Sequence, residues 1–426
     1  MSYQQKGFKI EHKLSPILLC VSFISSSAFA DTPSPYERSG HHPVKAPTLI
    51  MGKSAVKVGG YIKLDTMITS YNDGTINPPN PPSPGQDFLF PISIPVNAPP
   101  IFKSNPDFHM HAKQSRLWVK SETPIHNCTL NTTFEIDFIN STQGNELSTN
   151  GYSPRLRHAF GSLGEWLAGQ TWSTFMDIPS YPELVDFGGP AGQIFVRQPQ
   201  IRWTKMLHDK HVKFEAAIEN PTVTFTPINS TVVDLTENKK YPDIVARFTY
   251  DNEIVHMGIS GLARNLLLHL QNVSPLSPNK WTFAGNIFGK ITPIQNSKDN
   301  LLFLANYGNA LGRYVDYSFF PDAYITPTKS IFTPNIFAGY IGVQHFWCPT
   351  MRSSIVYGYS NVDIDKDDAI NGFVSQGARS LHVNLMWNPY EPITVGIEYI
   401  WGERELVNDL EGNINRGQLG IQYNFG

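Results

Sequence analysis

Hydrophobic and polar residues alternate along most of this chain with a period of two. In the stretch 56–65, valine, isoleucine and leucine share one face, whereas Lys57, Lys63 and Asp65 share the other. The same alternation recurs in 212–219. A period of two predicts half-buried β-strands and not amphipathic helices, whose apolar residues recur every three to four positions.

Extended to the C-terminus, this pattern predicts sixteen strands. They lie near 56–71, 108–122, 128–139, 153–161, 165–172, 196–205, 211–220, 242–250, 254–264, 280–291, 300–310, 335–347, 350–361, 377–388, 393–404 and 415–425. Long connections alternate with short turns, and the long ones cover 72–107, 140–152, 173–195, 221–241, 265–279, 311–334, 362–376 and 405–413. An antiparallel barrel with an even number of strands has long loops at one end and short turns at the other. The predicted fold class is therefore all-β, a transmembrane antiparallel β-barrel of porin type.

Charge distinguishes the two sides of the predicted barrel. Placing Arg or Lys against the middle of a bilayer costs roughly 2–4 kcal/mol, so the face of each strand that carries basic residues must line the lumen. The opposite faces, as in 393–401 and 419–425, are apolar and aromatic. The strands near 153–161 and 165–172 fit less well, since His158 falls on the apolar side. This misfit suggests that they pack against another protomer.

The first thirty residues have the pattern of a secretory signal. Three lysines precede an apolar stretch that ends in Ala28-Phe29-Ala30, which is a small-x-small cleavage site. Beyond this signal, no run of about 18 apolar residues predicts a spanning helix. We therefore divide the chain into a signal peptide at 1–30, a flexible periplasmic lead at 31–54 and the barrel at 55–426.

Composition agrees with a barrel and excludes other classes. Aromatic residues make up 12% and charged residues 16% of the chain, against a typical charged share of about 25%. Without residues 1–30, 30 basic and 35 acidic residues remain, a net charge of −5, which excludes a generally basic nucleic-acid binder. Only Cys128 and Cys348 remain after removal of the signal. They are expected at turns far apart around the barrel, so the exported chain is no disulfide scaffold.

Several longer motifs span nearly the whole mature chain. They are GGYIKLD at 59–65, LRHAFG at 156–161, LAGQTWSTF at 167–175, DFGGP at 186–190, IFVRQPQIRW at 194–203, GIEY at 396–399 and RGQLGIQYNF at 416–425. These motifs resemble the DcaP-like porin family of Gram-negative outer membranes. The chain departs from that family in having no heptads between Asp31 and Ser54, and it ends on Gly426 and not on the aromatic Phe425.

The resemblance implies a homotrimer of sixteen-stranded barrels in the outer membrane that takes up small anions, dicarboxylates among them. It also implies that the third extracellular loop, here 173–195, folds inward and narrows the pore.

The charges around the narrowest part of a channel set its selectivity. We predict a basic pore wall from six arginines on strands in the early half of the barrel or near its seam: Arg116, Arg155, Arg157, Arg202, Arg404 and Arg416. Opposite them, the loop 173–195 carries Asp177, Glu183 and Asp186. Arg binds planar carboxylates through two parallel hydrogen bonds, which suits an anion-preferring pore. The alternative is that these residues form ordinary ion pairs that hold the loop to the wall.

The sequence gives little support for an enzyme or a cofactor-binding protein. No Gly-x-Ser-x-Gly elbow occurs, and 188–192 is Gly-rich without the Lys and Ser/Thr of a phosphate loop. We expect no enzyme activity, no cofactor, no metal and no nucleic-acid partner. The expected partners are outer-membrane lipid, small anionic solutes and further copies of the chain.

Two rival functions stay open. One is a surface-exposed structural protein or adhesin on a barrel anchor, which the Pro-rich connection 72–107 motivates. The other is an outer-membrane hydrolase on a smaller barrel. Sixteen strands favour a porin, because barrels of about eight strands are filled by their own side chains, whereas porin-sized barrels leave a channel.

Overall fold

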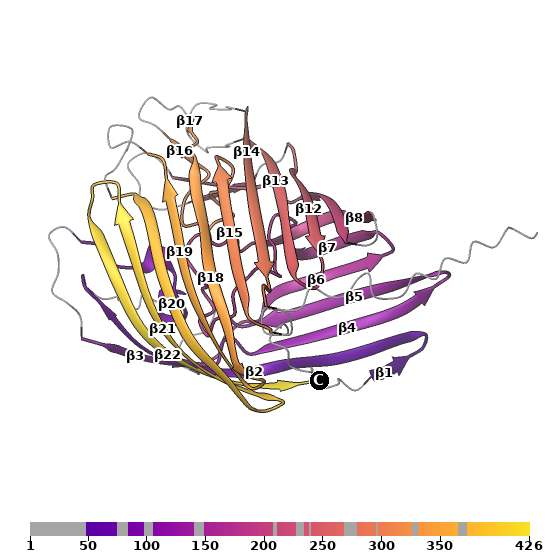
Figure 1. Ribbon diagram of the computed structural model, residues 1–426. Coiled ribbons are helices and arrows are strands. Elements are labelled where there is room, and N and C mark those ends of the chain that lie inside the picture. The colour runs from indigo at the N-terminus through magenta and orange to yellow at the C-terminus, as the bar shows by residue number, and fades with distance from the viewer. Residues whose placement is uncertain are drawn as a thin grey trace, which may run out of the picture.

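A closed ring of antiparallel strands makes up most of the described chain (Figure 1). The computed structural model describes residues 48–74, 84–97, 105–139, 149–207, 211–226, 234–237, 240–267, 279–294, 297–325, 331–364 and 373–426. The predicted signal peptide 1–30, most of the predicted lead 31–54 and the Pro-rich run 77–83 lie outside these residues.

All sixteen predicted strands are present, and each end lies within four residues of its predicted position. The strands of the ring are β2 (Ser54–Tyr71), β3 (Asp107–His111) with β4 (Arg116–Ile125), β5 (Cys128–Asp137), β6 (Arg155–Leu163), β7 (Trp166–Trp172), β8 (Arg197–Leu207), β9 (Val212–Glu219), β12 (Asp243–Asp251), β13 (Val255–Leu267), β14 (Asn279–Ile291), β15 (Asn300–Gly308), β18 (Ile336–Cys348), β19 (Met351–Val362), β20 (Ser375–Tyr390), β21 (Ile393–Leu406) and β22 (Glu411–Phe425). Both β3 and β4 pair with β2, so together they occupy one strand position in the ring. The ring closes where β22 pairs with β2.

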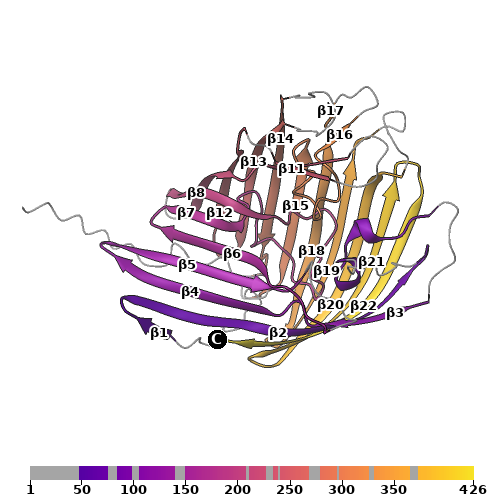
Figure 2. The ribbon, with the colours of Figure 1, turned by 180° about the vertical axis from the view of Figure 1, so that it is seen from behind.

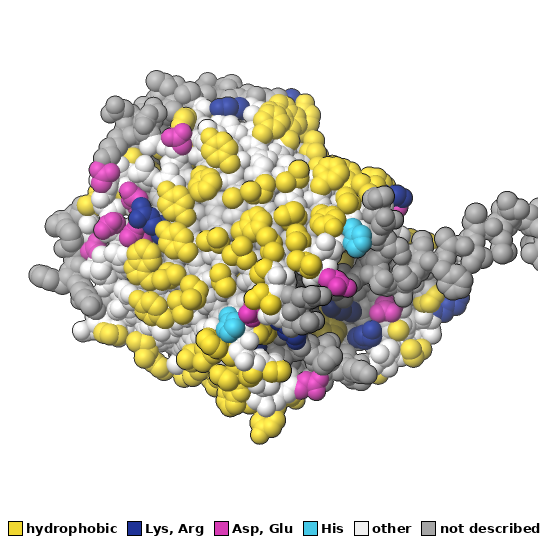
Figure 3. Space-filling model, in the orientation of Figure 1, with side chains coloured by type: hydrophobic (Ala, Val, Ile, Leu, Met, Phe, Trp, Pro, Cys, Tyr) yellow, Lys and Arg dark blue, Asp and Glu magenta, His cyan; other side chains and the backbone are white. Residues whose placement is uncertain are grey.

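Alternating side chains give the ring an inner and an outer face. In β22, Arg416 and Gln418 are buried on the inside. Leu419, Ile421 and Tyr423, which follow them at alternate positions, are exposed on the outside. Figure 3 shows hydrophobic side chains spread across the outer surface of the strands, with charged ones mainly toward its margins. The period of two thus separates a polar interior from an apolar outer wall, as the sequence predicted.

Three connecting segments fill the inside of the ring, and we call them the first (84–97), second (173–195) and third (309–322) inner segments. Their apolar side chains are almost fully buried, and they include Phe88, Leu89, Ile94, Phe175, Met176, Leu184, Leu311, Tyr314, Phe319 and Phe320. The first contains the helix α1 (Pro84–Asp87) and the 3-10 turn η1 (Pro91–Ser93). Figures 1 and 2 both show α1 within the curve of the strands. No helix in the described part of the chain is long and apolar enough to cross a membrane.

A second, four-stranded sheet lies at the end of the ring that carries the long connections (Figure 2). Its strands, in the order β11-β10-β16-β17, are β10 (Thr222–Thr226), β11 (Asp234–Glu237), β16 (Ala323–Ile325) and β17 (Ile331–Phe332). The sequence pattern had predicted only connections there, because strands of two to five residues are too short to show a period.

The stretch 31–54 differs from its prediction at its end. Thr48–Met51 forms β1 and pairs with Ser54–Lys57 of β2, and Gly52 between them has a φ of 64°. Glycine adopts this left-handed conformation without steric cost. The part of the predicted flexible lead that is described is therefore a hairpin.

A bulge between β5 and β6 corrects the orientation predicted for His158. The register shifts between Glu135, which is opposite His158, and Ile136, which is opposite Leu156. Arg157 lies between these two partners on β6 and is the extra residue. A bulge reverses the in–out alternation beyond it. His158 is buried and its Nδ1 lies 3.0 Å from the hydroxyl of Thr171. His158 therefore faces inward, and it gives no support for contact with another protomer.

Candidate functional site

The second inner segment crosses the inside of the ring from one wall to the other. On one side, Arg247 of β12 donates a hydrogen bond to the carbonyl of Met176 (2.8 Å). On the other, Lys63 of β2 donates to the carbonyl of Val185 (2.7 Å). Ser380 of β20 then accepts the amide of Ala191 (2.8 Å). The strands from which these partners come lie on different sides of the ring, so the segment spans the lumen.

Two of the three acidic residues predicted for this segment anchor it to the wall. The carboxylate of Asp177 lies 3.1 Å from Nε2 of His256. Burial raises the pKa of Asp177, but the hydrogen bond from His256 and the charge of Arg247 outweigh it and hold the pKa well below its usual range. Glu183 accepts a hydrogen bond of 2.6 Å from Nε of Arg352. Both charges are thus neutralised by partners on the strands.

The third acidic residue, Asp186, joins two inner segments. Its carboxylate accepts the amide N–H of Leu89 (3.1 Å) and that of Gly189 (3.2 Å). Burial raises the pKa of Asp186 to about 6, against the opposing charge of Arg416. The prediction placed all three acids opposite a basic wall; in the structure each is paired with a residue of the protein.

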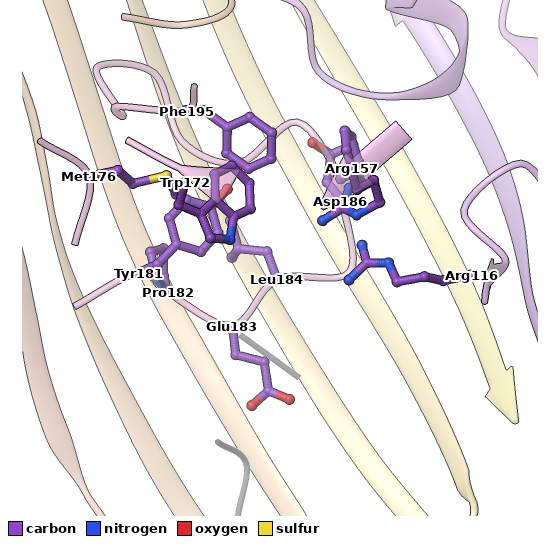
Figure 4. A pocket seen from close by; sticks show the side chains of 11 residues that line it. Arg116, Arg157, Trp172, Met176, Tyr181, Pro182, Glu183, Leu184, Asp186 and Phe195 are labelled. Carbon is purple, nitrogen blue, oxygen red and sulfur yellow. The ribbon is translucent and has the colours of Figure 1, made fainter. Parts of the chain in front are cut away.

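Three of the six predicted arginines come together on the wall formed by β4, β5 and β6. Arg157 donates to Glu135 (2.6 Å) and Asp137 (2.8 Å). Arg155 binds Asp137 through two hydrogen bonds of 2.8 Å, and Arg116 lies 3.5 Å from Glu135. Figure 4 shows Arg116 and Arg157 pointing toward the same space, with Glu183 turned away from them.

The other three predicted arginines lie elsewhere. Arg202 is 3.7 Å from Glu215, in a separate cluster between β8 and β9. Arg404 donates to the carbonyl of Ile92 (2.8 Å), and Arg416 donates to Thr69 (2.9 Å) and to the carbonyl of Gly85. Arg404 and Arg416 therefore hold the first inner segment in place.

A fourth arginine, which the sequence analysis did not single out, joins the cluster. Arg197, the first residue of β8, lies with its guanidinium 4.6 Å from the ring centre of Trp172 and 5.7 Å from that of Phe195. Trp172 also lies 5.8 Å from the guanidinium of Arg157. We call Arg116, Arg155, Arg157 and Arg197 the arginine cluster. Cation–π contacts of this kind contribute about 0.5–2 kcal/mol each.

A cavity of about 40 Å³ lies between the arginine cluster and the second inner segment. Its lining combines two of these arginines with a mainly apolar set of residues: Arg116, Arg157, Trp172, Met176, Tyr181, Pro182, Glu183, Leu184, Asp186, Phe187 and Phe195. The described part of the lumen thus brings guanidinium groups and aromatic rings to one narrow place.

One group of side chains has the residue types of a metal site, but its hydrogen bonds do not fit one. Asp87, His109 and His111 offer ligand atoms within 4.8 Å of one another. Lys113 already binds both carboxylate oxygens of Asp87 (2.8 and 2.9 Å). Nδ1 of His111 accepts the amide of Lys113 (3.2 Å), which leaves the proton on Nε2, the atom that faces Asp87. The group therefore fastens α1 to β3.

Asp316 of the third inner segment predicts a pH dependence. Its carboxylate accepts the amide of Gly192 (2.8 Å) and the hydroxyl of Ser360 (3.0 Å), and burial raises its pKa to about 7. Since the unfolded value is about 3.9, the folded protein binds this proton more tightly. The bound proton therefore stabilises the folded state fully below about pH 4. This contribution falls as the pH rises toward about 7 and is absent above about pH 7.

Asp316→Asn keeps an acceptor and removes the titration. We expect the midpoint of thermal unfolding, followed by circular dichroism, to change less between about pH 4 and pH 8 in this variant than in the wild type. An equal change in the two proteins would contradict the assignment.

Comparison with known proteins gives one family and a set of similar folds. The sequence profile of the family described as DcaP outer membrane protein matches residues 93–425. The crystal structure of the outer membrane channel DcaP of Acinetobacter baumannii has a TM-score of 0.73 at 22% identity, covering 89% of this chain and 100% of that one. Salmonella typhi OmpF in complex with daunomycin gives 0.57 at 10% identity, covering 89% and 100%. An anion-selective porin from Comamonas acidovorans gives 0.52 at 11%, covering 87% and 100%. No curated protein matches the chain.

Proposed function

The chain belongs to the DcaP outer membrane protein family of integral outer-membrane porins, and we propose that it allows passive uptake of small hydrophilic anions, dicarboxylates among them. In this proposal the second inner segment forms the constriction. The arginine cluster forms the basic wall beside it. Arg202, Arg404 and Arg416 take part in other contacts and are not included in that wall.

The charge balance at the cluster is the observation that supports this proposal most. Three of the four arginines share two carboxylates, those of Glu135 and Asp137. The fourth, Arg197, has no ion pair with any residue that the structure describes. Asp177 and Glu183 of the second inner segment are paired on other strands and do not offset this excess. A positive excess between low-dielectric walls concentrates anions. The net charge of −5 for the mature chain is compatible with this, because local charges at the constriction set selectivity.

The remaining parts of the proposal concern export and assembly. Residues 1–30 direct the chain across the inner membrane, and the barrel acts as a homotrimer without enzyme activity. The outward residues Ala159, Gly161 and Ala168 of β6 and β7 are small, which leaves room for a second copy at this part of the wall.

Ion selectivity in planar bilayers tests the proposed function. With a potassium chloride gradient across the membrane, we expect a reversal potential of the sign that shows anion preference. Liposomes containing the protein should swell faster in succinate than in a neutral solute of similar size. A clear cation preference would contradict the proposal, and no solute flux at all would favour the structural protein or adhesin.

A further inference from the structure

We propose that Arg197 is the residue that binds the permeating carboxylate, and that the other three arginines of the cluster position it and shape the field around it. This inference rests on the proposed anion uptake and assigns one step of it to one side chain.

Pairing sets Arg197 apart from its neighbours. Arg155 and Arg157 bind carboxylates at 2.6–2.8 Å, and Arg116 lies 3.5 Å from one. Among the residues that the structure describes, the side chain of Arg197 has no hydrogen bond and no ion pair, and its Nη1 is buried without a partner. A buried charged donor without a partner is costly, and such groups in a functional region mark places where a ligand or water binds.

The geometry of Arg197 leaves its donors available. Trp172 and Phe195 lie against the guanidinium at 4.6 and 5.7 Å, which stabilises the cation without using its N–H groups. The N–H groups point outward in the plane of the guanidinium, in the fork that matches a carboxylate. The residue is partly exposed, and both rings line the cavity of the candidate site. Arg197 does not itself line that cavity, but a carboxylate that reaches the guanidinium beside these two rings would meet an arginine that is already held in place.

The surroundings make an anion the favoured ligand. The positive charges of Arg157, Arg155 and Arg116 repel the charge of Arg197, and the negative charge of Asp137 partly offsets this repulsion. An anion at Arg197 relieves this repulsion, whereas a cation would add to it. A planar carboxylate offers two oxygens that accept two parallel charge-assisted hydrogen bonds from the fork, whereas chloride offers a single acceptor atom, so we expect carboxylates to bind more tightly than chloride.

Channel block by succinate, with three variants, tests the assignment. The measured quantity is the succinate concentration that halves the chloride current through single channels. In Arg197→Gln we expect this concentration to rise about tenfold or more, the loss typical of a charge-assisted hydrogen bond, together with a weaker anion preference. In Arg197→Lys, which keeps the charge and loses the fork, we expect weaker block with the anion preference retained.

Arg202→Gln is the matched control. It removes the same charge from the same strand, and Glu215 keeps Arg247 and Lys213 as partners, so the barrel should assemble. We expect succinate block in this variant to equal that of the wild type.

The outcomes separate this inference from the proposed function. If the wild type prefers cations, both fail. If the wild type prefers anions and Arg197→Gln is blocked as strongly as Arg202→Gln, the anion pore stands and Arg197 is not its binding residue. Should Arg197→Gln fail to assemble, as judged by its mobility on unheated gels, Arg197→Lys decides: block equal to that of the wild type overturns the inference.

Discussion

Replacing residues 173–196 with a two-residue Asn-Gly turn is expected to raise the single-channel conductance at least about threefold, because it removes the inner segment that spans the lumen, and porin-sized barrels leave a wide aqueous channel where no segment fills them. The barrel can accept this change, since Trp172 and Arg197 are already paired neighbours on β7 and β8. Asn-Gly forms the tight turn that joins two antiparallel strands. Conductance is measured in planar bilayers.

Removal of the β1 hairpin residues 48–53 is the control for this deletion. β1 is exposed along its whole length and pairs with the start of β2, away from the inner segments. We expect the conductance of this variant to equal that of the wild type. If the deletion of 173–196 left the conductance unchanged as well, the second inner segment would not be the constriction.

Arg264→Ala is expected to lower the stability of the folded barrel by about 3–5 kcal/mol, the usual effect of removing one partner of a buried ion pair. The side chain of Arg264 is fully buried and binds Asp243 of β12 at 3.0 Å and Asp322 of the third inner segment. It also donates to the carbonyl of Thr222 at the start of β10. One guanidinium therefore joins the ring, an inner segment and the second sheet, and its loss leaves two buried carboxylates without a counter-charge.

Arg379→Ala gives the comparison for Arg264→Ala. Arg379 also contacts two carboxylates, Glu403 at 3.3 Å and Glu405 at 3.6 Å, but its side chain is 42% exposed. Exposed ion pairs contribute about 0–1 kcal/mol. We expect a large fall in the midpoint of thermal unfolding for Arg264→Ala and a small one for Arg379→Ala. Equal midpoints would show that the buried network is not what holds the connections to the ring.

The order of the strands and the sides of the wall followed from the sequence. A strand turns alternate side chains to opposite faces, so the positions of Lys63 and Arg416 among apolar neighbours already predict which face is inside. The alternation of long and short connections predicts an even-stranded barrel. Both depend on residues that are close in the chain, and for that reason a single sequence reveals them.

The alternation predicts the wrong side-chain direction wherever local geometry interrupts the regular strand. At the β5–β6 bulge, Arg157 and His158 both face inward although they are adjacent. Arg197 has the same parity as the exposed Pro199, so parity alone gave no sign that its guanidinium lies with the arginine cluster. The motif at 194–203 marked this stretch, but not the direction of the side chain.

What only the tertiary structure decided is which charges meet. Asp177, Glu183 and Asp186 share one loop, yet their partners are His256, Arg352 and the amide of Leu89. Closing the ring brings together segments that are far apart in sequence, as where Arg404 reaches the carbonyl of Ile92. The sequence by itself therefore determined the strands, the inward face and the excess of polar groups there. Distances across the lumen, and with them the pairing that leaves Arg197 available, follow from closure, because periodicity specifies the direction of a side chain and not its neighbours.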